Sequence, residues 1–320
     1  MSWKPRTVIA LILALAFAAP AVRQATRRRA LPKRLESRIA SFHGEMGIAV
    51  KDLETGDEIA LAGDRQFPTA SLIKLAVMVE VYHQMDEGKL RRDAVLKFAN
   101  EDKAGDEPVV LNQMEPGLNL TIPDLLALMI AFSDNTATNL LIRQVGTENV
   151  DRRMDSYGLP RTRLFRPTFR DGHADVLPEL EKEFGLGATT PREAARLMTL
   201  IAEGKVVSRA ACDEMLGLLA KQQDRQMIPR SLPFEREEIF VANKTGWDEE
   251  KIADAAGVKG EIRTDAASVK GPRSRFVIAI LSRRGRDKRP GADNDALVTG
   301  AALSRMVYDE LERRGAARSR

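Results

Sequence analysis

Strand-like patterns stand near both ends of this 320-residue chain, and helical patterns fill its middle. Residues 47–63 (GIAVKDLETGDEIALAG) predict two short strands around a turn at 54–57. From Thr69 to about Gly204 the pattern is mainly helical. Strand signals then return in 238–244, 261–269 and 275–283. Strands from both chain ends therefore enclose a helical middle, which predicts an α+β fold with one mixed or antiparallel sheet, flanking helices and an inserted all-α region.

The same pattern predicts two domains. Residues 31–69 and 205–320 form a discontinuous α/β domain, and residues 70–204 form an all-α domain. Helical spacing of apolar residues in 32–42 and 295–313 predicts one further helix at each end of the α/β domain.

The N-terminus has the layout of a secretory signal peptide. Lys4 and Arg6 precede an apolar run that ends at Val22, and small residues near its end suit a cleavage site. We assign residues 1–22 to the signal and 23–30 to a basic linker, and we expect export to the periplasm or the extracellular space. The arginines of the linker leave an uncleaved membrane anchor as the alternative, because basic residues there disfavour clean export.

Composition argues against several classes of protein. The 50 basic and 46 acidic residues are mixed along the chain, whereas a nucleic-acid-binding protein should have a clustered basic face. The three histidines have no metal-ligand spacing, so we expect no metal and no cofactor. Cys212 is the single cysteine and cannot form an internal disulfide. We expect a monomer.

Lys74 is out of place in the apolar stretch TASLIKLAVMVEV (69–81). In a helix that begins near Ser71, positions i and i+3 share a face, so the hydroxyl and the amine can meet. Apolar neighbours and the helix dipole should lower the pKa of Lys74, and a neutral lysine can activate a serine nucleophile. The alternative is a lysine whose charged end reaches solvent from an ordinary helix.

Two further clusters allow the same pair of interpretations. Ser133, Asp134 and Asn135 interrupt two apolar helical runs. They are either a helix cap or a proton relay with an amide that holds a substrate carbonyl. Lys244, Thr245 and Gly246 end a predicted strand. They are either a strand exit or a site for a substrate carboxylate, with a glycine that lets the ligand approach closely.

Together, Ser-x-x-Lys, Ser-Asp-Asn and Lys-Thr-Gly occur in the order typical of class A β-lactamases and penicillin-binding proteins. From about residue 35 to 313 the sequence resembles the class A β-lactamase-like serine hydrolases of this superfamily. The residues around each motif are also similar to those of the family, as in FPTASLIKLAV, LLALMIAFSDNTATNLLI, TTPREAARLM and VANKTGW. The resemblance implies the class A β-lactamase fold, an α/β domain from both chain ends with an all-α domain between them.

The resemblance also implies catalytic roles. Ser71 would be the nucleophile that forms an acyl-enzyme, and Lys74 would be its base or proton relay. Ser133 would protonate the leaving nitrogen, and Asn135 would hold the substrate amide. The backbone N–H groups of Ser71 and Trp247 would form the oxyanion hole.

For substrate binding, the resemblance implies that Lys244 and Thr245, followed by Gly246, receive the substrate carboxylate. Arg263, in a predicted strand, is a candidate second anchor for the same carboxylate. The alternative for Arg263 is an exposed strand arginine without a role.

One departure from the family pattern concerns deacylation. Efficient β-lactamases carry a Glu-x-x-Leu-Asn motif on a loop before the Thr-Thr-Pro helix start, and residues 166–191 lack it. The nearest match, LPELEKE, has Leu177 where the glutamate would stand. The candidate substitutes are Asp171, Asp175, Glu179, Glu181 and Glu183, and each is otherwise a solvated loop carboxylate.

Three hypotheses follow. The first is a hydrolase that opens β-lactams through an acyl-enzyme on Ser71. The second is a penicillin-binding or D-alanyl peptidase-like enzyme that acts on cell-wall peptides, or on another amide or ester, and deacylates slowly. The third is a non-catalytic binding protein of the same fold, against which the intact motifs argue.

Overall fold

The computed structural model describes residues 30–105, 109–236 and 238–318. Its helices are α2 (Ala30–Ala40), α3 (Lys74–Asp86), α4 (Ile122–Ala131), α5 (Asn135–Val145), α6 (Thr147–Ser156), α7 (Pro178–Phe184), α8 (Pro191–Ala202), α9 (Arg209–Leu219) and α10 (Asp295–Arg318). Short 3-10 helices are η1 (Ala70–Ile73), η2 (Asn100–Asp102) and η3 (Leu111–Gln113). The strands of the main sheet are β1 (Glu45–Asp52), β2 (Glu58–Leu61), β8 (Phe240–Glu249), β9 (Glu261–Lys270) and β10 (Arg275–Gly285).

The main sheet has the order β2-β1-β10-β9-β8 and is antiparallel throughout. Strands from the two chain ends pair in its middle, where Ile48 of β1 lies opposite Ile280 of β10. The α+β fold predicted from the sequence is thus confirmed, and the sheet is the antiparallel form. Small pairings elsewhere involve β3 (Phe67–Pro68), β4 (Val95–Lys97), β5 (Asn119–Thr121), β6 (Arg163–Leu164) and β7 (Gly187–Thr189).

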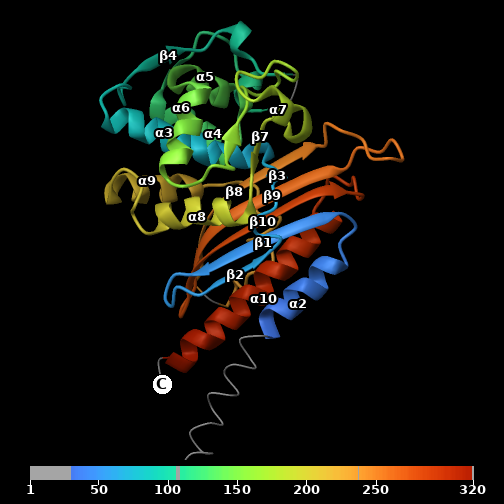
Figure 1. Cartoon of the computed structure of the whole chain (residues 1–320). Coiled ribbons are helices and arrows are strands. Elements are labelled where there is room, and N and C mark those ends of the chain that lie inside the picture. The colour runs from blue at the N-terminus through green and yellow to red at the C-terminus, as the bar shows by residue number, and fades with distance from the viewer. Residues whose placement is uncertain (1–29, 106–108, 237, 319–320) are drawn as a thin grey trace, which may run out of the picture.

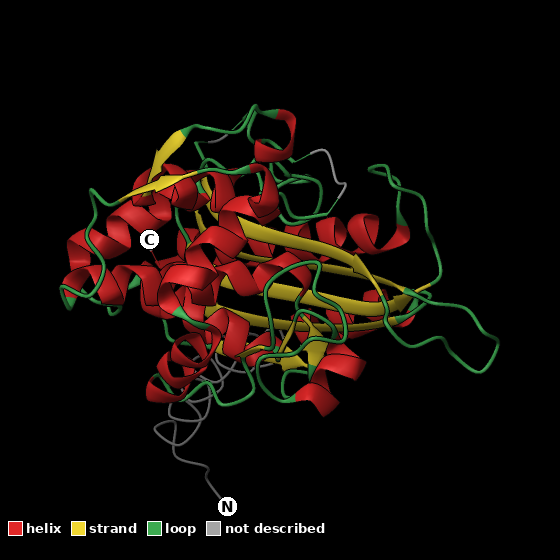
Figure 2. Ribbon diagram, turned by 90° about the horizontal axis from the view of Figure 1, so that it is seen from above, coloured by secondary structure: helices red, strands yellow, loops and turns green. Residues whose placement is uncertain are grey.

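Helices cover both faces of this sheet (Figure 1). On one face α2 and α10 pack together, and Ile278 and Ile280 of β10 join their apolar cluster. On the other face α8 packs on β1, β9 and β10, and Ala279 and Leu281 join a larger cluster with the helices of the middle of the chain. Successive residues of β10 thus enter opposite cores, as the alternation of a strand requires. Viewed from above, helices overlie the strands (Figure 2).

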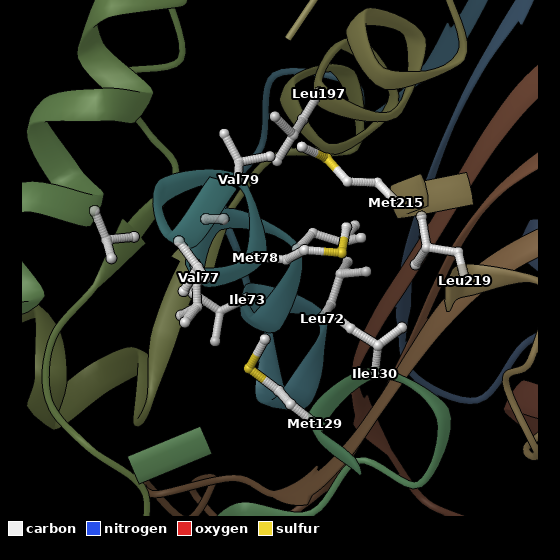
Figure 3. Packing of buried hydrophobic residues seen from close by; sticks show 14 of the residues in the cluster. Leu72, Ile73, Val77, Met78, Val79, Met129, Ile130, Leu197, Met215 and Leu219 are labelled. Atoms are coloured by element: carbon white, nitrogen blue, oxygen red, sulfur yellow. The ribbon is translucent and has the colours of Figure 1, made fainter. Parts of the chain in front are cut away.

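Helix α3 is the centre of the larger cluster. It is buried on nearly all sides, including the lysine at its first position. Around it, Figure 3 shows side chains from three other helices: Met129 and Ile130 of α4, Leu197 of α8, and Met215 and Leu219 of α9. A helix surrounded in this way cannot shift without opening cavities, which fixes the position of the residues at its start.

Helix α8 joins the helical middle to the sheet. Its first turn is capped as the sequence TTP suggests, because the Thr190 hydroxyl accepts a hydrogen bond from the Glu193 N–H at 3.1 Å and Pro191 follows the cap. The helix contacts both α9 and the sheet. The exact division into two domains stays a prediction.

Among the described residues, no helix is long and apolar enough to cross a membrane. The predicted signal peptide and all but the last residue of the basic linker fall outside the described residues.

Gly246 brings β8 against the turn that carries Ser71. A Cβ at this position would lie 2.6 Å from the Thr69 carbonyl oxygen and 2.8 Å from the Leu72 nitrogen. The side on which a Cβ would point is therefore filled by the protein's own chain. Close packing of strand and turn requires the glycine here.

We predict that Gly246→Ala destabilises the fold by about 1–3 kcal/mol, because the methyl group forces β8 away from η1. The matched control is Gly217→Ala, since Gly217 lies in α9 with no atom within 4 Å of an added Cβ. That control should be neutral or gain about 0.5–1 kcal/mol from helix propensity. Denaturant unfolding of both variants measures the difference, and equal stabilities would contradict the close-packing argument.

Candidate active site

Ser71 lies on a tight turn between a strand and a helix. The chain leaves β3 and enters η1, whose first residue, Ala70, has a left-handed φ of 44° and whose second residue is Ser71. The α-helix begins only at Lys74, so the predicted helix start at Ser71 is a 3-10 turn. A non-glycine residue at positive φ is strained, and such strain is concentrated at functional sites.

Lys74 is fully buried, with 0% of its surface exposed. Its ammonium donates hydrogen bonds to the Ser133 carbonyl oxygen at 2.6 Å, to the Ser133 hydroxyl at 3.2 Å and to Asn135 Oδ1 at 2.8 Å. The alternative of a lysine that reaches solvent is therefore wrong. The first two motifs meet through this ammonium.

Ser133 stands between two ammonium groups. Its hydroxyl accepts hydrogen bonds from Lys74 at 3.2 Å and from Lys244 at 3.1 Å. A hydroxyl that accepts from two cations directs its own proton elsewhere. The residue has a left-handed φ of 58°, which turns the chain between α4 and α5.

The middle residue of Ser-Asp-Asn has a structural role. Asp134 is fully buried, and it caps α5 by accepting from the Ala137 N–H at 2.8 Å. Its other oxygen accepts from the Leu111 N–H at 2.8 Å. The cap interpretation thus describes Asp134, while Ser133 and Asn135 meet the buried lysine.

Lys244 is also fully buried, on β8. Burial lowers the pKa of Lys244 to about 8, and the charges of Asp224 and Asp265 oppose this shift. Its ammonium donates to the Ser133 hydroxyl and, at 2.8 Å, to the Thr245 carbonyl oxygen. Burial also raises the pKa of Asp265 to about 7.

These elements surround one cavity of about 510 Å³. Of the residues predicted for the site, those that line it are Ser71, Ser133, Asn135, Thr245, Gly246 and Trp247. Lys74 and Lys244 are not among the lining residues, but both contact the cavity through the Ser133 hydroxyl. The three motifs are therefore brought together around a single opening.

Arg263 is not among the residues that line this cavity. It is buried, with 8% exposed, so it is not an exposed strand arginine either. Its guanidinium lies 5.0 Å from the ring centroid of Trp247 and forms an ion pair with Glu261 at 3.0 Å. Burial lowers the pKa of Arg263. Arg263 therefore packs against the Trp247 ring rather than into the cavity.

Among the candidate deacylating carboxylates, Asp171 alone lines the cavity. It forms ion pairs with Arg166 and, at 3.4 Å, with Lys251. Glu181 is buried against Arg166 at 2.8 Å. The others point to partners elsewhere: Asp175 accepts from Thr147, Glu179 pairs with Lys182, and Glu183 pairs with Arg283.

The structure adds residues to the cavity that carry no motif. Thr168 lines it and donates its hydroxyl to Asn139 Oδ1 at 2.9 Å, which fixes the loop to α5. Phe132 and Phe169 also line it. The sequence around Thr168 and Phe169 contains no motif that would predict a place in the site, whereas Phe132 directly precedes Ser-Asp-Asn. Thr168 and Phe169 reach the cavity only through the fold of their loop.

The chain is similar to known β-lactamases and to a penicillin-binding protein. The β-lactamase ROB-1 of Haemophilus influenzae is 24% identical over 296 residues, covering 91% of this chain and 88% of that protein. A β-lactamase structure from Sphaerobacter thermophilus is 28% identical with a TM-score of 0.72, covering 86% of this chain and 95% of the other. A PBP-A variant, solved as an acyl-enzyme complex with penicillin-G, is 26% identical with a TM-score of 0.72, covering 88% and 96%.

The model of the β-lactamase enzyme family matches residues 30–311, most of the chain. The chain therefore belongs to this family, and it is a β-lactamase-like serine hydrolase.

Proposed function

We propose that this chain opens β-lactam rings or related amides through an acyl-enzyme on Ser71. The observation that carries the proposal is the Ser133 hydroxyl, which accepts from the ammonium groups of both Lys74 and Lys244 at the wall of the cavity that Ser71 lines. Nucleophile, proton donor and two cationic groups thus share one opening.

The chemistry follows from these contacts. Lys74 first gives one of its protons to solvent. Ser71 Oγ then attacks the amide carbonyl carbon, and its proton passes to the neutral Lys74 amine. The backbone N–H groups of Ser71 and Trp247 stabilise the oxyanion. Collapse of the tetrahedral intermediate breaks the C–N bond, and Ser133 donates its proton to the leaving nitrogen. Lys74, 3.2 Å from the Ser133 hydroxyl, returns a proton to it.

Substrate binding uses the other motif residues. Asn135 holds the amide of the acyl side chain, and its Oδ1 is fixed by Lys74 at 2.8 Å. Thr245, which lines the cavity beside buried Lys244, binds the substrate carboxylate. We assign Arg263 no contact with that carboxylate, because it lies beneath Trp247.

Hydrolysis of the acyl-enzyme needs a group that activates water. We assign this role to Asp171, the loop carboxylate that lines the cavity. Its ion pairs with Arg166 and Lys251 hold it in place and neutralise much of its charge, so we expect slow turnover.

Those ion pairs also support the second candidate, a penicillin-binding or D-alanyl peptidase-like enzyme whose acyl-enzyme persists. The PBP-A variant that was captured with penicillin-G is a relative consistent with it. In either case the partner is a β-lactam or a cell-wall peptide. We further propose an exported monomer, which would contact a membrane only if its N-terminal segment is not cleaved.

The first test follows intact protein mass and drug loss after mixing with a penicillin. We expect an adduct on Ser71 that Ser71→Ala abolishes without loss of fold. The control Ser41→Ala, at an exposed serine, should keep the adduct. An adduct that survives in Ser71→Ala removes Ser71 as the nucleophile.

The second test separates the two candidates. We predict that Asp171→Asn lengthens the lifetime of the adduct by about 100-fold, in the range of general base catalysis. Asp175→Asn is the control, because Asp175 accepts from Thr147 and does not line the cavity. A long-lived adduct in the parent protein, unchanged by Asp171→Asn, would favour the penicillin-binding candidate.

The third test is the pH dependence of acylation. Lys244 carries its charge below its pKa of about 8, so acylation should fall as the pH rises through this value. In Lys244→Arg the charge persists at higher pH, and the alkaline decline should move upward. The rate constant for adduct formation, measured from pH 6 to pH 10 at roughly constant ionic strength, gives the profile. A decline unchanged in Lys244→Arg belongs to another group.

A further inference from the structure

Three exposed aromatic side chains surround the mouth of the cavity. Phe132 is 51% exposed, Phe169 is 46% exposed and Trp247 is 56% exposed, and all three line the cavity. We call them the aromatic rim. The protein leaves large apolar surfaces in water at the opening that contains Ser71, and such a cluster is typical of a binding surface.

The members of the rim are held in position. Phe169 has a left-handed φ of 56°, which is strained for a bulky residue, and its ring packs against the backbone of Gly105. Trp247 is stacked on the buried guanidinium of Arg263 at 5.0 Å. Arg263 is in turn paired with Glu261, so the indole lies on a fixed base. Two rings from separate segments are thus set at the opening.

The charges beside these two rings are paired with one another. Lys251 lies 3.4 Å from Asp171 and 3.5 Å from Asp248, and all three line the cavity. A charged group of a substrate would have to compete with these ion pairs. A neutral aromatic group gains stacking without that cost.

The direction of β8 indicates which part of a substrate meets the rim. Thr245, the proposed carboxylate site, precedes Trp247 by two residues on this strand. Asn135, the proposed site for the side-chain amide, lines the same cavity. The loop of Phe169 lies beside Asn135, because the Thr168 hydroxyl donates to the Asn135 carbonyl oxygen at 3.4 Å. A substrate whose carboxylate lies at Thr245 and whose amide lies at Asn135 would therefore have its acyl side chain near the loop of Phe169 and Trp247.

We propose that the aromatic rim binds an aryl group on the acyl side chain of the substrate, so that the enzyme selects aryl-acyl amides. This inference rests on the proposed function. It assigns Trp247 and Phe169 a specificity role, and it makes Arg263 a positioning residue for the indole.

The test compares two penicillins that differ by one phenyl ring, the phenylacetyl and the acetyl derivatives of 6-aminopenicillanic acid. Each rate constant for acylation is measured by intact mass. We expect the parent protein to prefer the phenylacetyl compound by about tenfold or more, and Trp247→Ala to reduce the ratio toward one. The backbone N–H of residue 247 remains in this variant. Phe169→Leu should reduce the ratio in the same direction.

The matched control is Phe240→Ala. Phe240 is 44% exposed on the same strand, and it does not line the cavity. Its removal should leave the ratio of the two rate constants unchanged.

A binding measurement covers the case in which a rim variant folds poorly. The chain has two tryptophans, Trp3 and Trp247, so Trp3→Phe leaves Trp247 as the only tryptophan of the full chain, and its emission can be excited selectively over that of the tyrosines. Combined with Ser71→Ala, which prevents acylation, its fluorescence reports binding at the rim. We expect the phenylacetyl compound to change the emission much more than the acetyl compound does. Adding Arg263→Gln should weaken this difference, because the indole loses its support.

The outcomes are distinguishable. If neither penicillin forms an adduct with the parent protein, the proposed function fails. If both form adducts at equal rates, the function stands and the inference is overturned. A preference that survives both Trp247→Ala and Phe169→Leu would also overturn it, because the selectivity would then arise elsewhere.

Discussion

Two buried lysines that meet on one serine hydroxyl are the interaction on which the site depends. A buried ammonium is tolerated only when it is well hydrogen-bonded. Lys74 meets this demand with the Ser133 backbone and the Asn135 amide, and Lys244 meets it with Ser133 and the Thr245 carbonyl. Three distant chain segments are therefore held in one arrangement by the need to solvate two charges.

The packing serves this arrangement. The helix that begins with Lys74 is enclosed by apolar side chains, and β8 approaches its start closely because Gly246 has no side chain (Figure 3). Removing either constraint would separate the amine from its oxygen partners. Asp134 contributes in a different way, since it caps α5 and thereby fixes the two residues beside it.

The sequence predicted the strands and the motif residues of the site, but not the roles of Asp134, Arg263 and Asp171. The apolar patterns predicted the strands near both chain ends, because the side chains of these strands pack in the two apolar cores. The motifs predicted Ser71, Ser133 and Asn135 at one opening, but they did not separate the cap role of Asp134 from the site. The position of Arg263 could not be predicted, because it depends on the register of β9 with β8. In the observed register Arg263 lies opposite Trp247. Asp171 could not be chosen from similar loop carboxylates, because only the fold of the loop determines which one faces inward.

The pairing of β1 with β10 has a consequence for folding during synthesis. Ile48 finds its partner in Ile280, so the middle of the sheet contains strands from opposite ends of the chain. Closing such a long loop is slow, and the pairing cannot begin while the C-terminal part is still being synthesised. The apolar faces of β1 therefore stay without their sheet partner until β10 has been synthesised, and unpaired apolar strands of this kind favour aggregation during folding.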